Sequence, residues 1–210
     1  MPYASIAALL ACAYVTTAWV QYRRAMRLRG ERERLQAGME IHHSAYGQML
    51  LYSSTRDQTA GQRFAAVLVM DPYSSGPLAC VHPRSTLDIR VLSGCLTLSV
   101  GGRKKKLLAG QMLSIPKRTA YRYFNADGEP VTAQVEAAPA SALDMFLVQV
   151  DRSGLGHRRH GLRAGLQGLC LFSAYDCTYL AALPIWLQKG LAMLAWPLAR
   201  ALRIRTYYPE

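Results

Sequence analysis

Residues 76–94 read GPLACVHPRSTLDIRVLSG, and this stretch decides the fold. Leu87, Ile89 and Val91 occupy alternate positions in it, as in a β-strand that turns its apolar side chains into a core. Glycines at the two ends of the stretch mark turns. The segment therefore predicts one strand of an all-β domain, with Cys80 and His82 shortly before it.

The surrounding sequence continues with short apolar runs separated by Gly, Pro, Asp and Ser. Gly101-Gly102 and Asp127-Gly128 are turn signals between such runs. Many short strands with glycine-rich turns indicate a sandwich or barrel. The strand candidates are residues 49–52, 64–70, 87–92, 96–100, 112–115, 121–124 and 131–135.

The apolar pattern changes to a helical period after about Leu143. Residues 165–182 and 185–202 are predicted helices, the second interrupted by Pro197. We therefore expect three parts: an N-terminal anchor with a basic stalk (1–37), a β-domain (38–150) and a helical extension (151–210).

The quoted stretch resembles the first motif of the cupin superfamily. In cupins this segment usually carries His-x-His, then Glu, then Gly. Anchoring the motif on His82 and Gly94 puts Cys80 at the first His place and Leu87 at the Glu place.

A second stretch resembles the second cupin motif, because Gly110, Pro116 and Asn125 match its spacing. Arg118 stands where the usual Gly belongs, and Tyr121 replaces the usual metal-binding His. The resemblance covers residues 38–210, with a tail similar to that of one cupin subgroup. It implies a mainly β fold: a cupin jelly-roll barrel with an N-terminal transmembrane and stalk helix and a C-terminal helical tail.

The resemblance also implies a site inside the barrel, where an ordinary cupin offers three imidazoles and one carboxylate to a divalent metal. Only His82 remains of that set, so we expect no metal cofactor. The alternative is iron or zinc held by Cys80, His82 and Tyr121, since thiolate, imidazole and phenolate are all ligands for such ions. Cys and Tyr would first have to lose protons in an apolar cavity, which costs free energy.

The same residues also fit a metal-free small-molecule pocket, because a few placed polar groups in an apolar cavity are typical of such sites. His82 and Tyr121 are the candidate catalytic residues, the histidine as an acid or base. The alternatives are purely structural roles: a hydrogen-bonded histidine in the barrel, a buried cysteine and solvated surface arginines. The candidate ligand-binding residues are Cys80, Leu87, Ile89, Tyr123, and, near the barrel mouth, Arg84 and Arg118.

The N-terminus carries an apolar run from Tyr3 to Tyr22, close to the length of about twenty residues that a membrane span needs. Arginines follow it and none precedes it. The positive-inside rule then predicts a single-pass membrane protein with the cupin domain on the cytoplasmic side. The alternative is an alanine-rich helix packed on the domain or on a partner.

The formal net charge of +12 favours acidic partners. We expect a small-molecule ligand and membrane lipid, and no nucleic acid, since the basic run 103–106 is predicted to lie on a solvated hairpin tip. The five cysteines are irregularly spaced and indicate a reduced, intracellular protein. The resemblance also allows a homodimer, and the last helix is expected to cover the barrel or a dimer partner, or else to lie on the membrane.

Three hypotheses follow for the function. The leading one is a membrane-anchored cupin that binds a mostly apolar small molecule, either purely as a binding protein or as a metal-free isomerase or cyclase. The second is a metal-dependent oxygenase or isomerase with a Cys/His/Tyr site. The third is a non-catalytic, membrane-tethered partner of another enzyme, so the sequence leaves open whether the protein is an enzyme.

Overall fold

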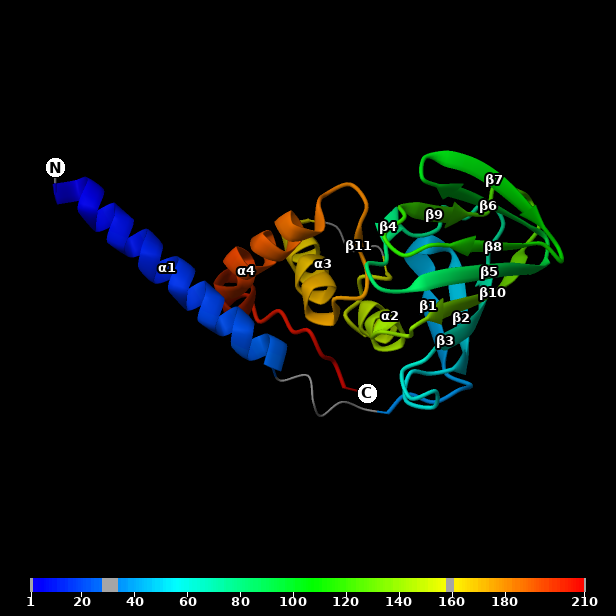
Figure 1. The fold of residues 1–210 in the computed structure, drawn as a ribbon, viewed down its shortest axis with the longest axis horizontal. Coiled ribbons are helices and arrows are strands. Elements are labelled where there is room, and N and C mark those ends of the chain that lie inside the picture. The colour runs from blue at the N-terminus through cyan, green and yellow to red at the C-terminus, as the bar shows by residue number, and fades with distance from the viewer. Residues whose placement is uncertain (1, 28–33, 158–160, 210) are drawn as a thin grey trace.

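The computed structural model describes residues 2–27, 34–157 and 161–209, and its β-strands form two antiparallel sheets that face each other (Figure 1). One sheet has the order β1 (Glu40–His43), β2 (Gln48–Ser54), β3 (Phe64–Met70), β10 (Val131–Ala138), β5 (Thr86–Ser93) and β8 (Met112–Ile115). The other has the order β11 (Tyr179–Leu180), β4 (Cys80–Val81), β9 (Tyr121–Phe124), β6 (Cys95–Val100) and β7 (Arg103–Leu108).

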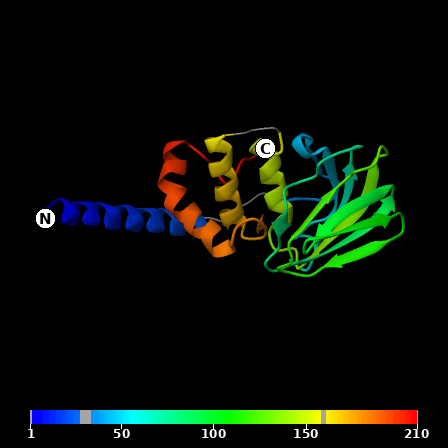
Figure 2. The same ribbon diagram turned by 90° about the horizontal axis from the view of Figure 1, so that it is seen from above.

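The helices are stacked beyond one end of the two sheets (Figures 1 and 2). A short 3-10 turn, η1 (Ser44–Tyr46), joins β1 to β2. Moving outward from the sheets come α2 (Leu143–Arg152), α3 (Leu162–Tyr175) and α4 (Ile185–Ala201). The long α1 (Pro2–Arg27) crosses α4, and its N-terminal half stands clear of the rest of the molecule.

All seven predicted strands are present, because alternation of apolar residues correctly identifies strands that bury one face. Leu87, Ile89 and Val91 of β5 are buried in the core between the sheets, as expected. The mainly β fold with flanking helices is confirmed. The four strands missing from the prediction are β1, β4, β7 and β11, of which β4 and β11 have two residues each.

Three expectations are wrong. The helix predicted over residues 165–182 ends at Tyr175, and residues 179–180 form β11 instead. Residues 103–106 do not form a hairpin tip but belong to β7, which pairs with β6 through a tight turn at Gly101-Gly102. Its basic side chains are exposed on an edge strand, where charge discourages further strand pairing. Pro197 does not interrupt the last helix, which continues through it to Ala201. The boundary predicted at residue 150 falls inside α2.

The N-terminal helix meets the predicted requirement for length and composition. Residues Ser5–Met26 have a mean hydropathy of 1.3, which is enough for a helix that could cross a membrane. Its C-terminal half packs against α4: Ala18 is fully buried, and the Tyr22 ring lies edge-on to Trp196 at 5.6 Å. The middle of the predicted stalk, residues 28–33, lies outside the described residues.

The helical layer is fastened to the sheets at several points. β11 adds to the edge of β4, pairing Tyr179 with Val81. The Tyr52 hydroxyl donates to the backbone carbonyl of Asp144 at 2.7 Å, which ties β2 to the start of α2. The final segment of the chain runs beside α2 and α3, where the Tyr208 amide donates to the Gln149 side chain at 2.6 Å.

Gly76 is a position where the fold requires glycine. Its φ is +61°, and a Cβ there would lie 2.0 Å from the backbone oxygen of Tyr123. This close approach seats the segment before β4 against β9.

We therefore expect Gly76→Ala to lower the free energy of unfolding by about 3 kcal/mol or more, since backbone would have to move. Gly61→Ala is the matched control, because Gly61 also has a positive φ (+82°) but a Cβ there would have no atom within 4 Å. The control should lose only about 1 kcal/mol of left-handed backbone strain. Urea unfolding of the detergent-solubilised chain measures both, and equal losses would contradict the close approach.

Candidate functional site

A cavity of about 920 Å³ extends from between the two sheets to the inner sides of α2 and α3. Most of its lining is aliphatic or aromatic, including Leu50, Leu87, Phe146 and Phe172. None of the described residues that line it is Asp, Glu, Lys or Arg. Its polar groups are few. Hydrogen bonds arrange most of them in two relays, and the Cys80 thiol lies within hydrogen-bonding reach of Tyr121 and Thr178 beside the first relay.

The first relay starts at Tyr121 on β9. The Nδ1 atom of His82 lies 3.0 Å from the backbone carbonyl of Cys177, which can only accept, so Nδ1 carries the proton. In the neutral ring Nε2 then accepts from the Tyr121 hydroxyl at 2.7 Å. The Tyr121 proton is therefore directed at the histidine, and the histidine proton at the carbonyl.

The second relay starts at Tyr123, two positions along the same strand. Its hydroxyl donates to Gln48 Oε1 at 3.0 Å, and Gln48 Nε2 donates to His43 Nδ1 at 3.1 Å. His43 Nε2 in turn donates to the Leu147 carbonyl at 3.3 Å. The Tyr121 and Tyr123 rings are stacked with centroids 6.4 Å apart, and both side chains line the cavity.

Burial keeps all these groups neutral near pH 7. It lowers the pKa of His82 and of His43 below the usual value, because the charged imidazolium is poorly solvated there. It raises the pKa of the Cys80 thiol and of the Tyr123 hydroxyl, and raises that of Tyr121 well above its usual value. The cavity therefore holds proton donors and acceptors without a fixed charge.

The family model for the cupin domain matches residues 66–135, which run from within β3 into β10. Residues 66–135 are a cupin domain. The match includes both motif stretches and the tyrosines of both relays. No curated protein has a matching sequence.

Several solved cupin structures are similar to this chain. A sugar phosphate isomerase from Silicibacter pomeroyi is 15% identical over 53% of this chain and 77% of its own, with a TM-score of 0.44. The polyketide cyclase RemF from Streptomyces resistomycificus is 16% identical over 51% of this chain and 80% of its own, with a TM-score of 0.43. KdgF from Halomonas sp. is 14% identical over 46% and 84%, with a TM-score of 0.40.

The metal that the cupin fold implies does not fit the residues present. The only imidazole at the motif positions, His82, has both ring nitrogens in hydrogen bonds. Cys80 and Tyr121 hold their protons more tightly than usual, which opposes thiolate or phenolate ligation. Within the described residues no group of three His, Cys, Asp or Glu side chains is placed to hold a metal ion.

The structure places five of the predicted site residues around the cavity: Cys80, His82, Leu87, Tyr121 and Tyr123. The other three lie elsewhere. Ile89 is fully buried in the core but does not line the cavity. Arg84 forms an ion pair with Asp176.

Arg118 also lies outside the cavity lining. Its φ is +64°, the left-handed region that explains the glycine of the usual cupin motif. Its backbone amide donates to the His82 carbonyl at 2.8 Å, so this turn holds His82 through backbone contact.

Sequence reasoning missed His43, Gln48 and Cys177, which complete the two relays. Gln48 occupies the first inward position of β2, on the same face of the strand as Leu50 and Tyr52. The one sequence signal for Gln48 was that a polar residue stands at the first inward position of a strand whose other inward residues are apolar. Cys177 contributes only its carbonyl, which no side-chain pattern reveals.

The lowered pKa values of His82 and His43 predict how stability depends on pH. Below the ordinary pKa of 6.5 the unfolded chain binds protons that the folded chain does not, so stability is present above this pH and falls as pH decreases. Each histidine contributes a slope of at most about 1.4 kcal/mol per pH unit. His82→Gln should reduce the slope below pH 6.5 by up to that amount.

Urea unfolding at a series of pH values measures this slope. His42→Gln is the matched control, because His42 neighbours His43 in β1 but has an exposed side chain. A slope that is the same in His82→Gln and in the unmodified chain would show that folding does not suppress His82 protonation.

Proposed function

We propose that this protein is a membrane-attached cupin that binds a mostly apolar small molecule carrying a hydrogen-bond donor, and acts on it by metal-free proton transfer. The observation that carries the proposal is the pair of tyrosine hydroxyls, each backed by a histidine relay, in a cavity otherwise lined by apolar groups. An apolar lining with a few fixed polar groups is the usual construction of a small-molecule site.

The direction of the hydrogen bonds selects the ligand's polar group. Both tyrosine protons are used internally, by His82 and by Gln48, so the oxygens offer lone pairs to the cavity. A ligand hydroxyl, phenol or enol can donate to them, whereas an ether or ketone oxygen would face another acceptor. Two acceptor oxygens that face each other in a buried site without a hydrogen between them cost about 1–3 kcal/mol of binding free energy.

The first relay supports acid–base chemistry of the isomerase or cyclase kind. A ligand O–H proton passes to the Tyr121 oxygen as the Tyr121 proton passes to His82 Nε2. The products are a ligand oxyanion, a regenerated tyrosine and an imidazolium whose Nδ1–H still donates to the Cys177 carbonyl. An enolate or phenolate formed in this way is the nucleophile that a double-bond shift or ring closure requires.

Membrane attachment is supported by the surface of α1. Its N-terminal half exposes Ile6, Leu9, Leu10 and Val15, and arginines appear only at its other end. This arrangement favours a span with the cupin domain on the cytoplasmic side. The cavity has an apolar rim: Leu78 and Leu183 both line it and are 63% and 42% exposed. An apolar ligand dissolved in the bilayer would meet few polar groups on entering there.

The ligand preference can be tested with 2-naphthol and 2-methoxynaphthalene, which differ in the donor hydrogen. The unmodified chain should bind the naphthol about tenfold more tightly, the value of one buried hydrogen bond. Tyr121→Phe with Tyr123→Phe should abolish the preference and leave methoxynaphthalene binding unchanged or stronger. Probe fluorescence reports both affinities.

Tyr73→Phe is the matched control, because Tyr73 is 75% exposed and does not line the cavity. Equal affinity for the two probes in the unmodified chain would contradict the donor preference. A stoichiometric transition metal in the purified chain by elemental analysis would contradict metal-free chemistry.

Attachment can be tested by membrane fractionation of the full chain. Leu9→Glu with Leu10→Glu should move the protein to the soluble fraction, because a charged residue in a membrane-spanning helix costs about 2.5–3.5 kcal/mol. Leu92→Glu with Leu108→Glu, two exposed leucines on the sheets, is the matched control and should leave the distribution unchanged. Recovery of the unmodified chain in the soluble fraction would refute attachment.

A further inference from the structure

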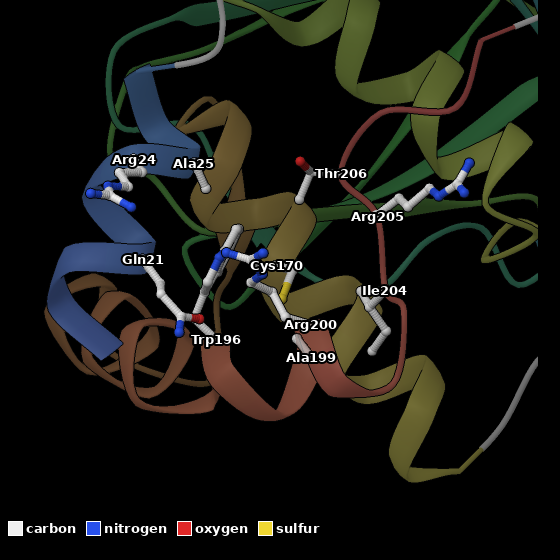
Figure 3. A pocket seen from close by; sticks show the side chains of 10 residues that line it. All are labelled: Gln21, Arg24, Ala25, Cys170, Trp196, Ala199, Arg200, Ile204, Arg205 and Thr206. Atoms are coloured by element: carbon white, nitrogen blue, oxygen red, sulfur yellow. The ribbon is translucent and has the colours of Figure 1, made fainter. Parts of the chain in front are cut away.

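A second, smaller pocket of about 330 Å³ lies where α1, α4 and the C-terminal segment meet (Figure 3). Gln21 and Arg24 of α1 form one wall, and Ile204 and Arg205 form the opposite one. The pocket is separate from the cupin cavity, and their lining residues do not overlap.

Three arginines surround this pocket: Arg24, Arg200 and Arg205. Figure 3 shows Arg200 extending from α4 towards the middle, with Arg24 and Arg205 on opposite sides and their guanidinium groups turned outward. Among the ion pairs of the described residues, none involves these three arginines. Three arginines that line one pocket and have no ion pair with a carboxylate of the described residues favour an anion, and guanidinium groups suit phosphate in particular.

The pocket also contains a polar atom without a partner. The side-chain oxygen of Gln21 is buried and accepts no hydrogen bond from any described residue. A buried acceptor left unpaired costs free energy, and a ligand with a hydroxyl group would satisfy it. The pocket thus has groups for a phosphate and for a neighbouring hydroxyl.

The surface beside the pocket is apolar over two helices. The outer side of α4 and its flanking residues expose Leu183, Trp186, Leu191, Leu194, Leu198 and Leu202, with Trp186 at 74%. α4 is the layer nearest the free half of α1, so both apolar surfaces belong to the same end of the molecule (Figures 1 and 2). A helix with one apolar face and cations near its end is typical of the membrane interface.

The distances along α1 match this arrangement. Arg24 follows Ser5 by about 28 Å at 1.5 Å per residue, close to the thickness of the hydrocarbon layer. Tyr22, which contacts Trp196 of α4, lies only about 3 Å along the axis from Arg24. When α1 spans the bilayer, the pocket therefore stands at the level of the cytoplasmic phosphates.

We infer that this pocket binds the headgroup of an anionic phospholipid, with the phosphate on Arg200, with Arg24 and Arg205 turning their exposed side chains inward to meet it, and with a headgroup hydroxyl on Gln21. The inference rests on the proposed membrane attachment and adds a lipid-selective site to it. Bound lipid would add a bridge between the C-terminal segment and α1 and α4, which already contact each other through Tyr22 and Trp196.

The test is calorimetric titration of the full chain in neutral detergent with dioctanoyl phosphatidylglycerol, dioctanoyl phosphatidylcholine and glycerol 3-phosphate. Phosphatidylglycerol should bind at one site, at least tenfold more tightly than phosphatidylcholine. Arg200→Gln and Arg24→Gln should each weaken it about tenfold, as expected for one charge-assisted hydrogen bond. Arg103→Gln removes the same charge from β7, far from the pocket, and should change nothing.

Each contrary result has a distinct meaning. Equal binding of the two lipids, or equal losses in Arg103→Gln and Arg200→Gln, would overturn the pocket as a specific site. Glycerol 3-phosphate binding as tightly as the lipid would overturn the lipid as its ligand. If the chain leaves the membrane in fractionation yet binds phosphatidylglycerol here, attachment through α1 fails while the headgroup site stands. If it stays in the membrane without lipid preference, only the headgroup site fails.

Discussion

The pairing of β11 with β4 is the contact on which the site depends. β11 belongs to the helical extension and β4 to the cupin domain, and their two residue pairs bring the Cys177 carbonyl to 3.0 Å from His82. Asp176 strengthens this junction through ion pairs with Arg84 and with Lys189 of α4, and accepts a hydrogen bond from Tyr179 at 2.5 Å. Burial alone would raise the pKa of Asp176, but these partners lower it, so the carboxylate stays charged. The extension therefore sets the tautomer of the central histidine as well as closing the barrel.

The departures from the cupin motif are consistent with one another. A carboxylate at position 87 would favour a charged His82 and so place a permanent ion pair in an apolar cavity, where the desolvation of both charges costs free energy. Leu87 carries no charge, so His82 can stay neutral. Tyr121 then donates a hydrogen bond to the neutral His82 ring, at the position where a cupin would have a metal. Leu87 and Tyr121 therefore place a neutral, hydrogen-bonded His82–Tyr121 pair where the usual cupin motif has metal ligands.

Much of the fold could be predicted from sequence, because β5 and β10 bury one face and so show alternation, and β3 is a continuous apolar run. β4 and β11 could not, since two residues carry no period, and β7 was hidden because an exposed edge strand made of basic residues reads like a turn. Within the site, the motif spacing located Cys80, His82 and Tyr121. Gln48 and His43 lie outside both motifs, and only the folding of β1 and β2 across the sheet brings them to Tyr123.

α4 connects the two ends of the molecule. On its inner side Gln188 lines the cupin cavity, is almost fully buried, and exchanges hydrogen bonds with the backbone of Leu180 in β11 at 2.9 and 3.2 Å. On its outer side the same helix is apolar and exposed, and near its end Trp196 packs on α1. Gln188 and the ion pair of Lys189 with Asp176 therefore join α4 to residues 176–180, the segment whose Cys177 carbonyl orients His82. One helix thus contacts both α1 and the segment that fixes the His82 ring.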